Sequence, residues 1–363
     1  MRILVVAGAR PNFVKAGPLF PALERAGFEA DLAFTGSRSS SRETSEAARV
    51  TFYGVEVPKP RWFLDVGEGT EAVQTGEALV AFEGLLATEA PDALLVIGDV
   101  NSTLAAAIAA AKLSIPVIHL GAGMRCGDCD APEEINRLLI SRVTSSHLAP
   151  TEAAMRNLLD EGVDPERIHF VGSIMAESVL RHAEQVRRLD ASAEFGLTPQ
   201  SYVLASFHRP ENVDSPERLF AIIEGLGSLQ RPVLIPDSVG LTARLAGQGL
   251  DLPESMTLVP AVPYMHMLAL QRDADVVLTD SGGIQEEACV LGTPCVTVRE
   301  TTEYSATVEV GANRLCEADS DAIVGCIGEA SRGKRTWVTP KRWDRAVSGR
   351  IVRALKRGVP DLT

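Results

Sequence analysis

The sequence predicts an α/β protein built from two Rossmann-like, doubly wound domains. Short apolar runs alternate with helical stretches along the whole chain, a pattern typical of parallel strands joined by crossover helices. A chain of 363 residues is longer than one hydrophobic core usually supports, so two domains are expected. The hydrophobic content of 45% includes few aromatic residues, which suits helices packed on buried parallel sheets.

The first half carries the pattern of one such domain. Strands are predicted at residues 3–7, 30–34, 93–97, 117–120, 147–149 and 168–171. Helical stretches follow them, for example at residues 103–112 and 133–143. Parallel strands need such crossovers, so these elements predict a parallel sheet with helices on its faces.

The second half repeats the scheme and closes with a helix. Strands are predicted at residues 203–207, 233–235, 257–259, 276–279 and 295–298. A polar, charged stretch separates the halves, so the expected domains are residues 1–172 and 173–340. A final helix at 343–356, within a segment 341–363 expected to pack back on the first domain, has an apolar stripe. The stripe consists of Trp343, Ala346, Val347, Ile351 and Leu355.

Composition excludes several classes of partner. The net charge of −13, from 35 basic and 48 acidic residues, would repel nucleic acid, and no run of basic residues offsets it locally. No apolar stretch reaches the roughly 18 residues of a membrane span. The predicted first strand begins directly after Arg2, which leaves no room for a signal peptide. We therefore expect a cytoplasmic protein without a membrane partner.

Cys126 and Cys129 are spaced as a CxxC pair. One pair lacks the four ligands of a structural zinc site, and a thioredoxin-type motif should open a helix after a strand. Reduced loop cysteines are favoured over a metal or redox role.

The junction at residues 279–287 is the most informative segment. It follows a predicted buried strand, and a helix is predicted at 285–291, so Ser281, Gly282 and Gly283 should present free N–H groups at a helix N-terminus. Such a corner binds phosphate. Glu286 and Glu287, expected in the first helical turn, favour the dipole and can reach a sugar hydroxyl. The alternative is a glycine-rich turn with ordinary first-turn carboxylates.

Other strand ends carry candidate site residues. Arg10 follows the first strand and Lys15 lies about one turn inside the next helix, where both can clamp a diphosphate or form a solvated basic pair. Asp99 follows the strand at 93–97, although aspartate there is commonly a plain N-terminal helix residue. Glu133 and Arg137 share a helix face and can also form a simple surface pair.

Two further candidates lie in the second half. His208 follows the strand at 203–207 and is a candidate for neutralising or protonating a leaving group, whereas a lone histidine is more often structural. Tyr264 offers an aromatic face that can border a base, and a core tyrosine is the alternative.

Taken together, these motifs resemble the non-hydrolysing UDP-N-acetylglucosamine 2-epimerases. The motifs that carry the likeness are Arg10-Pro11 with Lys15, Gly98-Asp99, Pro132-Glu133-Glu134 with Asn136-Arg137, His208-Arg209 with Glu211-Asn212, and Asp280 to Glu287 followed by Thr301-Thr302-Glu303. They cover nearly the whole chain, and their shared order and spacing make a chance likeness implausible.

The resemblance implies a two-lobed GT-B-like fold with UDP in the cleft, mostly on the second lobe, and a homodimer. It implies anti elimination of UDP to a 2-acetamidoglucal, followed by re-addition that inverts C2. Departure of the diphosphate acidifies the C2 proton, so a carboxylate can take it while cations stabilise UDP. The resemblance implies no metal or redox cofactor.

It also implies roles for individual residues. The groups expected to contact the diphosphate are Arg10, His208, Ser281, Gly282 and Gly283. Glu287 would hold the ribose, Tyr264 would lie beside uracil, and Lys15 would lie near the phosphates or the sugar. Asp99 and Glu133 match two proton-transfer carboxylates, and His208 would assist the leaving group. Arg137 would line the sugar pocket.

The chain departs from the family pattern at several positions. Gly121 stands where a third active-site carboxylate is expected, and losing such a group commonly costs orders of magnitude in rate. Asp128 or Glu134 are possible substitutes. Residues 37–40 lack the glutamines and histidine of the family's allosteric site, and Tyr304 replaces an arginine. These differences suggest a divergent member with a modified sugar substrate.

Two alternatives to the epimerase therefore stay open. With Gly121 widening the pocket, water can intercept the intermediate, which would give a hydrolysing enzyme that releases UDP and free sugar. Alternatively, the chain is a catalytically impaired UDP-sugar-binding paralogue.

Overall fold

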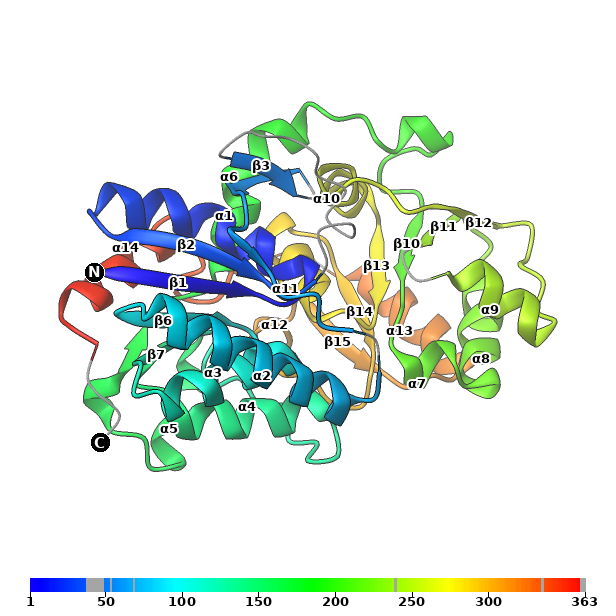
Figure 1. The fold of residues 1–363 in the computed structure, drawn as a ribbon. Coiled ribbons are helices and arrows are strands. Elements are labelled where there is room, and N and C mark those ends of the chain that lie inside the picture. Colours follow the sequence, from blue (N-terminus) through cyan, green and yellow to red (C-terminus); the bar gives the residue numbers. More distant parts are fainter. Residues whose placement is uncertain (37–48, 53, 68, 238–239, 334–335, 360–363) are drawn as a thin grey trace. The chain divides into compact units, whose positions relative to one another are not determined.

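The computed structural model describes residues 1–36, 49–52, 54–67, 69–237, 240–333 and 336–359. The chain forms two compact units (Figure 1). Unit 1 contains Met1–Ser178 and Lys341–Thr363, and unit 2 contains Val179–Pro340. We propose that these units are the two domains expected from the sequence. Residues 37–40, where the sequence lacks the glutamines and histidine expected from the resemblance, lie outside the described residues.

Unit 1 is built on a wholly parallel seven-stranded sheet with the order β5-β2-β1-β6-β7-β8-β9. Its strands are β1 (Arg2–Ala7), β2 (Glu29–Phe34), β5 (Trp62–Phe63), β6 (Ala93–Ile97), β7 (Val117–Leu120), β8 (Ser146–Ala149) and β9 (Ile168–Phe170). The central strand β6 reads Ala-Leu-Leu-Val-Ile and is buried throughout, as both faces of a parallel sheet are covered. The predicted strands are confirmed, but β5 and the antiparallel pair β3 (Arg49–Phe52) and β4 (Val55–Pro58) were not predicted.

Helices cover both faces of this sheet. They are α1 (Arg10–Arg25), α2 (Glu71–Glu89), α3 (Asn101–Lys112), α4 (Pro132–Val143), α5 (Glu152–Asp160), α6 (Ile174–Arg187, which crosses the boundary between the units) and α14 (Val347–Lys356). The alanine-rich α3 packs between α2 and α4 on one face (Figure 1). The helices α1 and α14 pack against each other. Helix α3 begins at Asn101, so the strand end at residue 97 is followed by only three residues of turn.

The last helix differs from its prediction. It begins at Val347, so Trp343 and Ala346 precede it rather than form its first turn. Ala346 is exposed, whereas Val347, Ile351 and Leu355 are buried as expected. The indole of Trp343 is buried and donates a hydrogen bond to the carbonyl of Pro150 at 3.3 Å.

Unit 2 has a parallel six-stranded sheet with the order β12-β11-β10-β13-β14-β15. Its strands are β10 (Val203–Ser206), β11 (Val233–Asp237), β12 (Met256–Pro260), β13 (Val276–Thr279), β14 (Cys295–Val298) and β15 (Asn313–Cys316). Its helices are α7 (Pro210–Val213), α8 (Pro216–Gly227), α9 (Leu241–Gln248), α10 (Tyr264–Asp273), α11 (Gly282–Leu291), α12 (Ser305–Glu309) and α13 (Ser320–Arg332). Two parallel sheets covered by helices confirm the predicted α/β class.

Helix α11 starts earlier than predicted. It begins at Gly282 rather than at Gln285, with Ser281 as its N-cap residue. Glu286 and Glu287 therefore lie beyond the first turn, and both are buried. The expectation that they are first-turn carboxylates was wrong, because two glycines were taken for a loop although the first turn of a helix tolerates them.

None of the helices in the described ranges combines the length and the apolar character needed to cross a lipid bilayer.

Candidate active site

Each sheet has one point where the strand order reverses, and these points organise the site. In unit 1 it lies between β1 and β6, and in unit 2 between β10 and β13. Ligands of open α/β sheets bind beyond the carboxyl ends of the strands at such points. Gly8 and Asp99 lie just beyond the unit 1 pair, and His208 and Asp280 just beyond the unit 2 pair. The predicted residues therefore gather at both reversal points.

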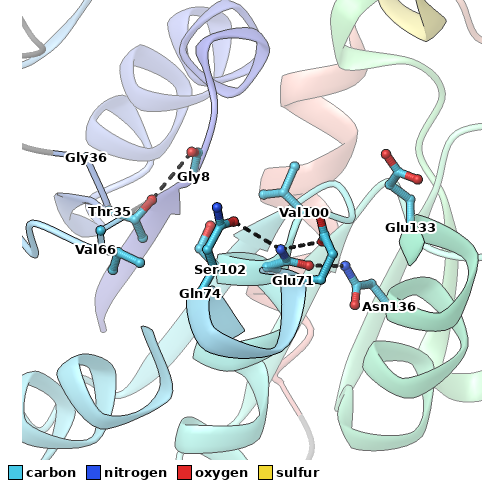
Figure 2. Close-up of a pocket in the computed structure, with 12 residues that line it drawn as sticks. Gly8, Thr35, Gly36, Val66, Glu71, Gln74, Val100, Ser102, Glu133 and Asn136 are labelled. Atoms are coloured by element: carbon cyan, nitrogen blue, oxygen red, sulfur yellow. Dashed lines mark hydrogen bonds between the residues drawn. The ribbon is translucent and has the colours of Figure 1, made fainter. Parts of the chain in front are cut away.

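A polar pocket of about 390 Å³ opens at the reversal point of unit 1 (Figure 2). It is lined by Gly8, Thr35, Gly36, Val66, Gly67, Glu71, Gln74, Val100, Asn101, Ser102, Glu133 and Asn136. Two carboxylates and three amides are among these side chains, and no lysine or arginine is. The lining suits a ligand that donates hydrogen bonds.

A hydrogen-bond network orders the amides of this pocket. Asn101 Nδ2 donates to Glu71 Oε2 at 2.6 Å and to Gln74 Oε1 at 3.3 Å (Figure 2). Asn136 Nδ2 donates to Asn101 Oδ1 at 3.1 Å and to the carbonyl of Asp99 at 2.9 Å. The network links α2, α3 and α4 across the pocket. Sequence reasoning missed Glu71 and Gln74, because no local spacing connects them to a residue thirty positions away.

Arg137 joins two carboxylates beside the pocket. It is 3% exposed, its Nε lies 2.7 Å from Glu134 Oε2, and its Nη1 is ion-paired with Asp99. The alternative of a surface pair with Glu133 was therefore wrong, because Arg137 turns inward to Glu134 instead. The two predicted residues Asp99 and Arg137 are brought together, and Arg137 fixes the carboxylate of Asp99 in place.

Glu134 is a site residue that the sequence suggested only as a possible substitute. Its carboxylate is buried and accepts the backbone N–H groups of Cys126 (3.2 Å) and Gly127 (3.1 Å). Burial alone would raise its pKa, but the charge and hydrogen bond of Arg137, with these N–H donors, lower it below the ordinary value. Glu134 stays ionised and ties the loop at 126–127 to Arg137.

Glu133 differs from its neighbour. Its side chain is half-buried, lines the pocket, and makes no hydrogen bond or ion pair with the residues described in the structure. A carboxylate without a fixed partner at a pocket wall is available to take or give a proton.

Of the two basic residues predicted on α1, the structure describes the side chain of Lys15 but not that of Arg10. Arg10 is the first residue of α1, and its side chain lies outside the described part. Lys15 is half-buried, one turn further along. The N–H groups of Gly8 and Ala9 both bond to Asn12 Oδ1 at 2.9 Å, so this loop does not offer them to a phosphate.

Gly121 follows β7 and adopts a φ of +94°, a conformation that L side chains rarely occupy. A Cβ at this position would meet no atom within 4 Å. The position where a third carboxylate was expected is therefore open space, but a side chain there would strain the backbone.

Two buried histidines belong to the sheet of unit 1. His119 and His147 are paired side by side on β7 and β8 and are each 1% exposed. Burial lowers the pKa of His119 to about 4 and that of His147 to about 3, and nearby arginine and histidine charges add to the effect. His119 Nε2 lies 2.8 Å from the carbonyl of Gly98, whereas neither ring nitrogen of His147 bonds to a described residue. This layer is held uncharged.

In unit 2, Asp280 holds the loop that carries His208. Asp280 is fully buried and accepts the backbone N–H groups of His208 and Arg209 at 3.0 Å and the Asn212 side chain at 3.0 Å. His208 Nδ1 lies 3.3 Å from Asp280 Oδ1, while the His208 side chain is 40% exposed. Nδ1 of His208 therefore lies against the buried Asp280 carboxylate. Asp280 was quoted only as part of a motif.

The N-terminus of α11 carries Ser281, Gly282 and Gly283, the predicted phosphate corner. The Ser281 N–H donates a hydrogen bond to Thr279 Oγ1 at 3.0 Å, so the expectation of a free N–H group at Ser281 was wrong. A Cβ on Gly282 would lie 2.2 Å from Cε2 of Tyr304. Gly282 therefore leaves room for the Tyr304 ring. From the sequence, this glycine was expected only to allow the close approach of a ligand.

Glu287 and Tyr264 are also brought together. Their side chains share a hydrogen bond, and Gln271 Nε2 donates to Glu287 Oε2 at 2.7 Å. Burial raises the pKa of Glu287 to about 7, against the lowering effect of these bonds. The pKa of the Tyr264 hydroxyl is raised by burial and by the Glu287 charge. The hydroxyl of the half-buried Tyr264 thus has a hydrogen-bonded partner, as tyrosines in a protein core usually do.

The cysteines of the CxxC pair are free thiols. Cys126 Sγ lies 3.4 Å from Arg137 Nη2, and Cys129 is exposed. Within the described ranges, no three or more His, Cys, Asp or Glu side chains form a group suited to a metal ion.

Comparisons with known proteins agree with this arrangement. A family model described as UDP-N-acetylglucosamine 2-epimerase matches residues 22–356. The chain is 35% identical to UDP-N-acetylglucosamine 2-epimerase of Methanocaldococcus jannaschii, over 99% of this chain and 100% of that one. It is 38% identical to UDP-2,3-diacetamido-2,3-dideoxy-D-glucuronate 2-epimerase of Pseudomonas aeruginosa, over 89% and 90% of the two chains. The crystal structure of the Methanocaldococcus jannaschii enzyme in complex with UDP-GlcNAc and UDP superposes with a TM-score of 0.88 at 34% identity, covering 99% and 100% of the two chains.

Proposed function

The chain belongs to the UDP-N-acetylglucosamine 2-epimerase family, and from this premise we propose that it is an isomerase that inverts C2 of a UDP-N-acetylhexosamine. The reaction is anti elimination of UDP to a 2-acetamidoglucal followed by re-addition. The proposal is carried by Glu133, which lines the unit 1 pocket, and by Asp99, which directly precedes the lining residue Val100 and is ion-paired with Arg137. A helix N-terminus at the reversal point of unit 2 completes the observation.

In this proposal unit 2 binds the nucleotide. The N–H groups at the start of α11 and the His208 side chain contact the diphosphate, since a helix N-terminus favours anions. Glu287 holds the ribose hydroxyls and Tyr264 borders uracil. Arg10 and Lys15 of unit 1 add positive charge at the leaving group.

Unit 1 carries out the proton transfers. Inversion requires that the C2 proton leave from one face of the sugar and return on the other, which calls for an acid–base group on each face. Asp99, oriented by Arg137, and Glu133 supply them. Loss of UDP from C1 builds positive charge at the ring and acidifies the C2 proton.

The acidic lining of the unit 1 pocket also indicates which sugar the enzyme accepts. Glu71 and Glu133 line it and no described lining residue is cationic, so a uronate carboxylate would meet negative charge without compensation. Hydroxyl and amide N–H groups would instead find acceptors. We propose a neutral UDP-N-acetylhexosamine as substrate, in contrast to the glucuronate named for the Pseudomonas relative.

Incubation with UDP-N-acetylglucosamine in D2O tests the function. NMR should show the UDP-ManNAc anomeric signal and deuterium at C2 of both epimers. UDP-N-acetylglucosaminuronate, tested in parallel, should react more slowly. Absence of C2 deuterium with every UDP-N-acetylhexosamine would contradict the proposal.

Gly121 favours a second candidate, a hydrolysing epimerase that releases UDP and free sugar. The open space at this position can admit water to the intermediate. The two candidates separate on one assay, because the hydrolytic reaction would accumulate UDP and free sugar in equal amounts. If Gly121 instead marks an impaired paralogue, calorimetry would show UDP-sugar binding without turnover, and Gly121→Glu would restore activity despite backbone strain of about 1–3 kcal/mol.

We also propose that the protein acts as a cytoplasmic homodimer without a metal or redox cofactor. Light scattering should give twice the mass of the 38.8 kDa chain. EDTA should leave the rate unchanged.

A further inference from the structure

A second pocket in unit 1 is unlike the rest of the molecule in charge. It has a volume of about 300 Å³ and lies along the edge strand β9 and the C-terminal segment. Four arginines and a histidine line it: Arg342, Arg350, Arg353, Arg357 and His169. The chain as a whole carries a net charge of −13, so this is a local reversal.

Two of the arginines are held in place by the edge of the sheet. Arg350 Nε donates to the carbonyl of Val171 at 2.6 Å, and its Nη1 and Nη2 pair with Asp344 at 3.1 and 2.8 Å. Arg342 donates to the carbonyl of Phe170, and its guanidinium lies 4.5 Å from the centre of that ring. These contacts cover the carbonyls that an edge strand leaves open.

The other two arginines have no such structural use. Arg353 lies on α14 and Arg357, about one turn further on, is its C-cap residue. Both are exposed and make no hydrogen bond or ion pair with any described residue. Like charges four residues apart on a helix repel each other. Among the described residues, the carboxylate bonded to a lining arginine is that of Asp344, and it pairs with Arg350. The pair therefore lacks a counter-charge within the described protein.

His169 adds to this positive field. It projects from β9, and its pKa is lowered by partial burial and by the charge of Arg357. An anion between Arg357 and His169 would remove that penalty and raise the histidine pKa.

We propose that this pocket binds a small phosphomonoester, with the phosphate held by Arg353 and Arg357. Guanidinium groups match phosphate oxygens in paired hydrogen bonds. The pocket is larger than a phosphate ion needs, so the space toward Phe170 and Arg342 receives the organic part. The site goes beyond the proposed function: β9 is four strand steps from β1, about 20 Å at the usual spacing.

Calorimetric titration with glucose 6-phosphate tests this site, with UDP present at saturation so that the proposed nucleotide site is occupied. We expect one bound molecule per chain. The double variant Arg353→Gln with Arg357→Gln should weaken binding by about tenfold or more, because both charged forks are lost. Both residues are exposed, so the melting temperature should be unchanged.

Two controls keep the test decisive. Lys356→Gln removes one positive charge from the same helix at an exposed position outside the pocket, and binding should stay within about twofold. Replacing both arginines with lysine keeps the charge without the fork and should give an intermediate affinity. The site is refuted if glucose 6-phosphate does not bind at millimolar concentration, if the double glutamine variant binds as wild type does, or if Lys356→Gln weakens binding as much.

Discussion

The reversal points of the two sheets lie at equivalent places in their units but carry opposite electrostatic designs. In unit 1, Asp99, Arg137 and Glu134 form a chain of full charges beside an open pocket. In unit 2, Asp280 is buried and satisfied mainly by backbone N–H groups, and the surroundings offer a helix end. Backbone N–H groups at a helix N-terminus suit the binding of an anion that keeps its charge, such as a diphosphate. Carboxylates at a pocket wall, held by ion pairs, suit proton transfer.

The two units also differ in the type of group that burial keeps neutral. Burial lowers the pKa values of His119 and His147 in unit 1 and raises that of Glu287 in unit 2. All three groups are thereby shifted toward their neutral forms. Unit 1 should consequently lose stability in acid, and unit 2 as the pH rises toward neutrality.

The largest effect on stability is expected from removing the charge of Arg137, which lies between Asp99 and Glu134 in unit 1. Arg137→Met leaves the buried Glu134 carboxylate and Asp99 without their partner, so the free energy of unfolding should fall by about 3–5 kcal/mol. Urea unfolding measures this, with hydrogen exchange assigning the loss to unit 1. The exposed Arg142 on the same helix is the control, and Arg142→Met should cost about 0.5 kcal/mol or less. Equal effects of the two variants would show that the charge chain is unimportant for stability.

Acid should weaken unit 1 through His147. The folded protein holds its pKa at about 3 against an ordinary 6.5, so below pH 6.5 the unfolded state binds more protons and stability falls. The slope rises to about 1.4 kcal/mol per pH unit below pH 6.5, so the loss between pH 6.5 and 4.5 should be about 2 kcal/mol. His147→Leu should remove this contribution and leave that of His119, whose folded pKa is about 4, so the pH dependence should fall by about half. A pH profile unchanged by the substitution would contradict the neutral histidine layer.

Unit 2 should show the opposite slope through Glu287. Its folded pKa of about 7 lies above the ordinary 4.5, so between these values the folded state binds more protons and stability falls as the pH rises. The loss between pH 5 and 6.5 should be about 2 kcal/mol, and Glu287→Gln should remove it. The exposed Glu224 supplies a matched change in the same unit, and Glu224→Gln should leave the slope intact. A slope that survives Glu287→Gln would refute this assignment.

A smaller effect on stability is expected at Gly282, and it tests why a glycine is needed at the start of α11. Gly282→Ala places a methyl group against Tyr304 and should cost about 1–2 kcal/mol of stability. In a Tyr304→Ala background the cost should largely disappear, as urea unfolding would show. Gly325→Ala lies inside α13, where a Cβ meets no atom within 4 Å, and should stabilise the protein by about 0.5–1 kcal/mol. If UDP affinity falls equally in both backgrounds, the glycine is needed for the ligand rather than for Tyr304.

Much of the fold could be predicted because buried parallel strands read as continuous apolar runs. The strands β1, β6 and β13 are such runs, and their order along the chain predicted two parallel layers. Edge strand β15 was missed because Asn313-Arg314-Leu315-Cys316 is too polar to stand out. The start of α11 was misplaced because glycine is a poor helix former, although it is acceptable in a first turn capped by Ser281.

The site was predictable where it follows strands and not where it depends on side-chain direction. Asp99 and His208 follow strand ends, so sheet order alone brings them to the reversal points. The choice of Arg137 between Glu133 and Glu134 was not predictable, because spacings of three and four residues are both favourable on a helix. The assignment of catalytic and binding roles stays a prediction.

The central claim is that unit 1 performs the proton transfers while unit 2 holds the nucleotide. The most direct measurement is deuterium incorporation at C2 of saturating UDP-N-acetylglucosamine by Asp99→Asn, with UDP affinity measured on the same sample. We expect exchange to fall by about 10²–10⁴-fold with UDP affinity unchanged. Exchange at the wild-type rate, or a matching loss of UDP affinity, would contradict the division of labour between the units.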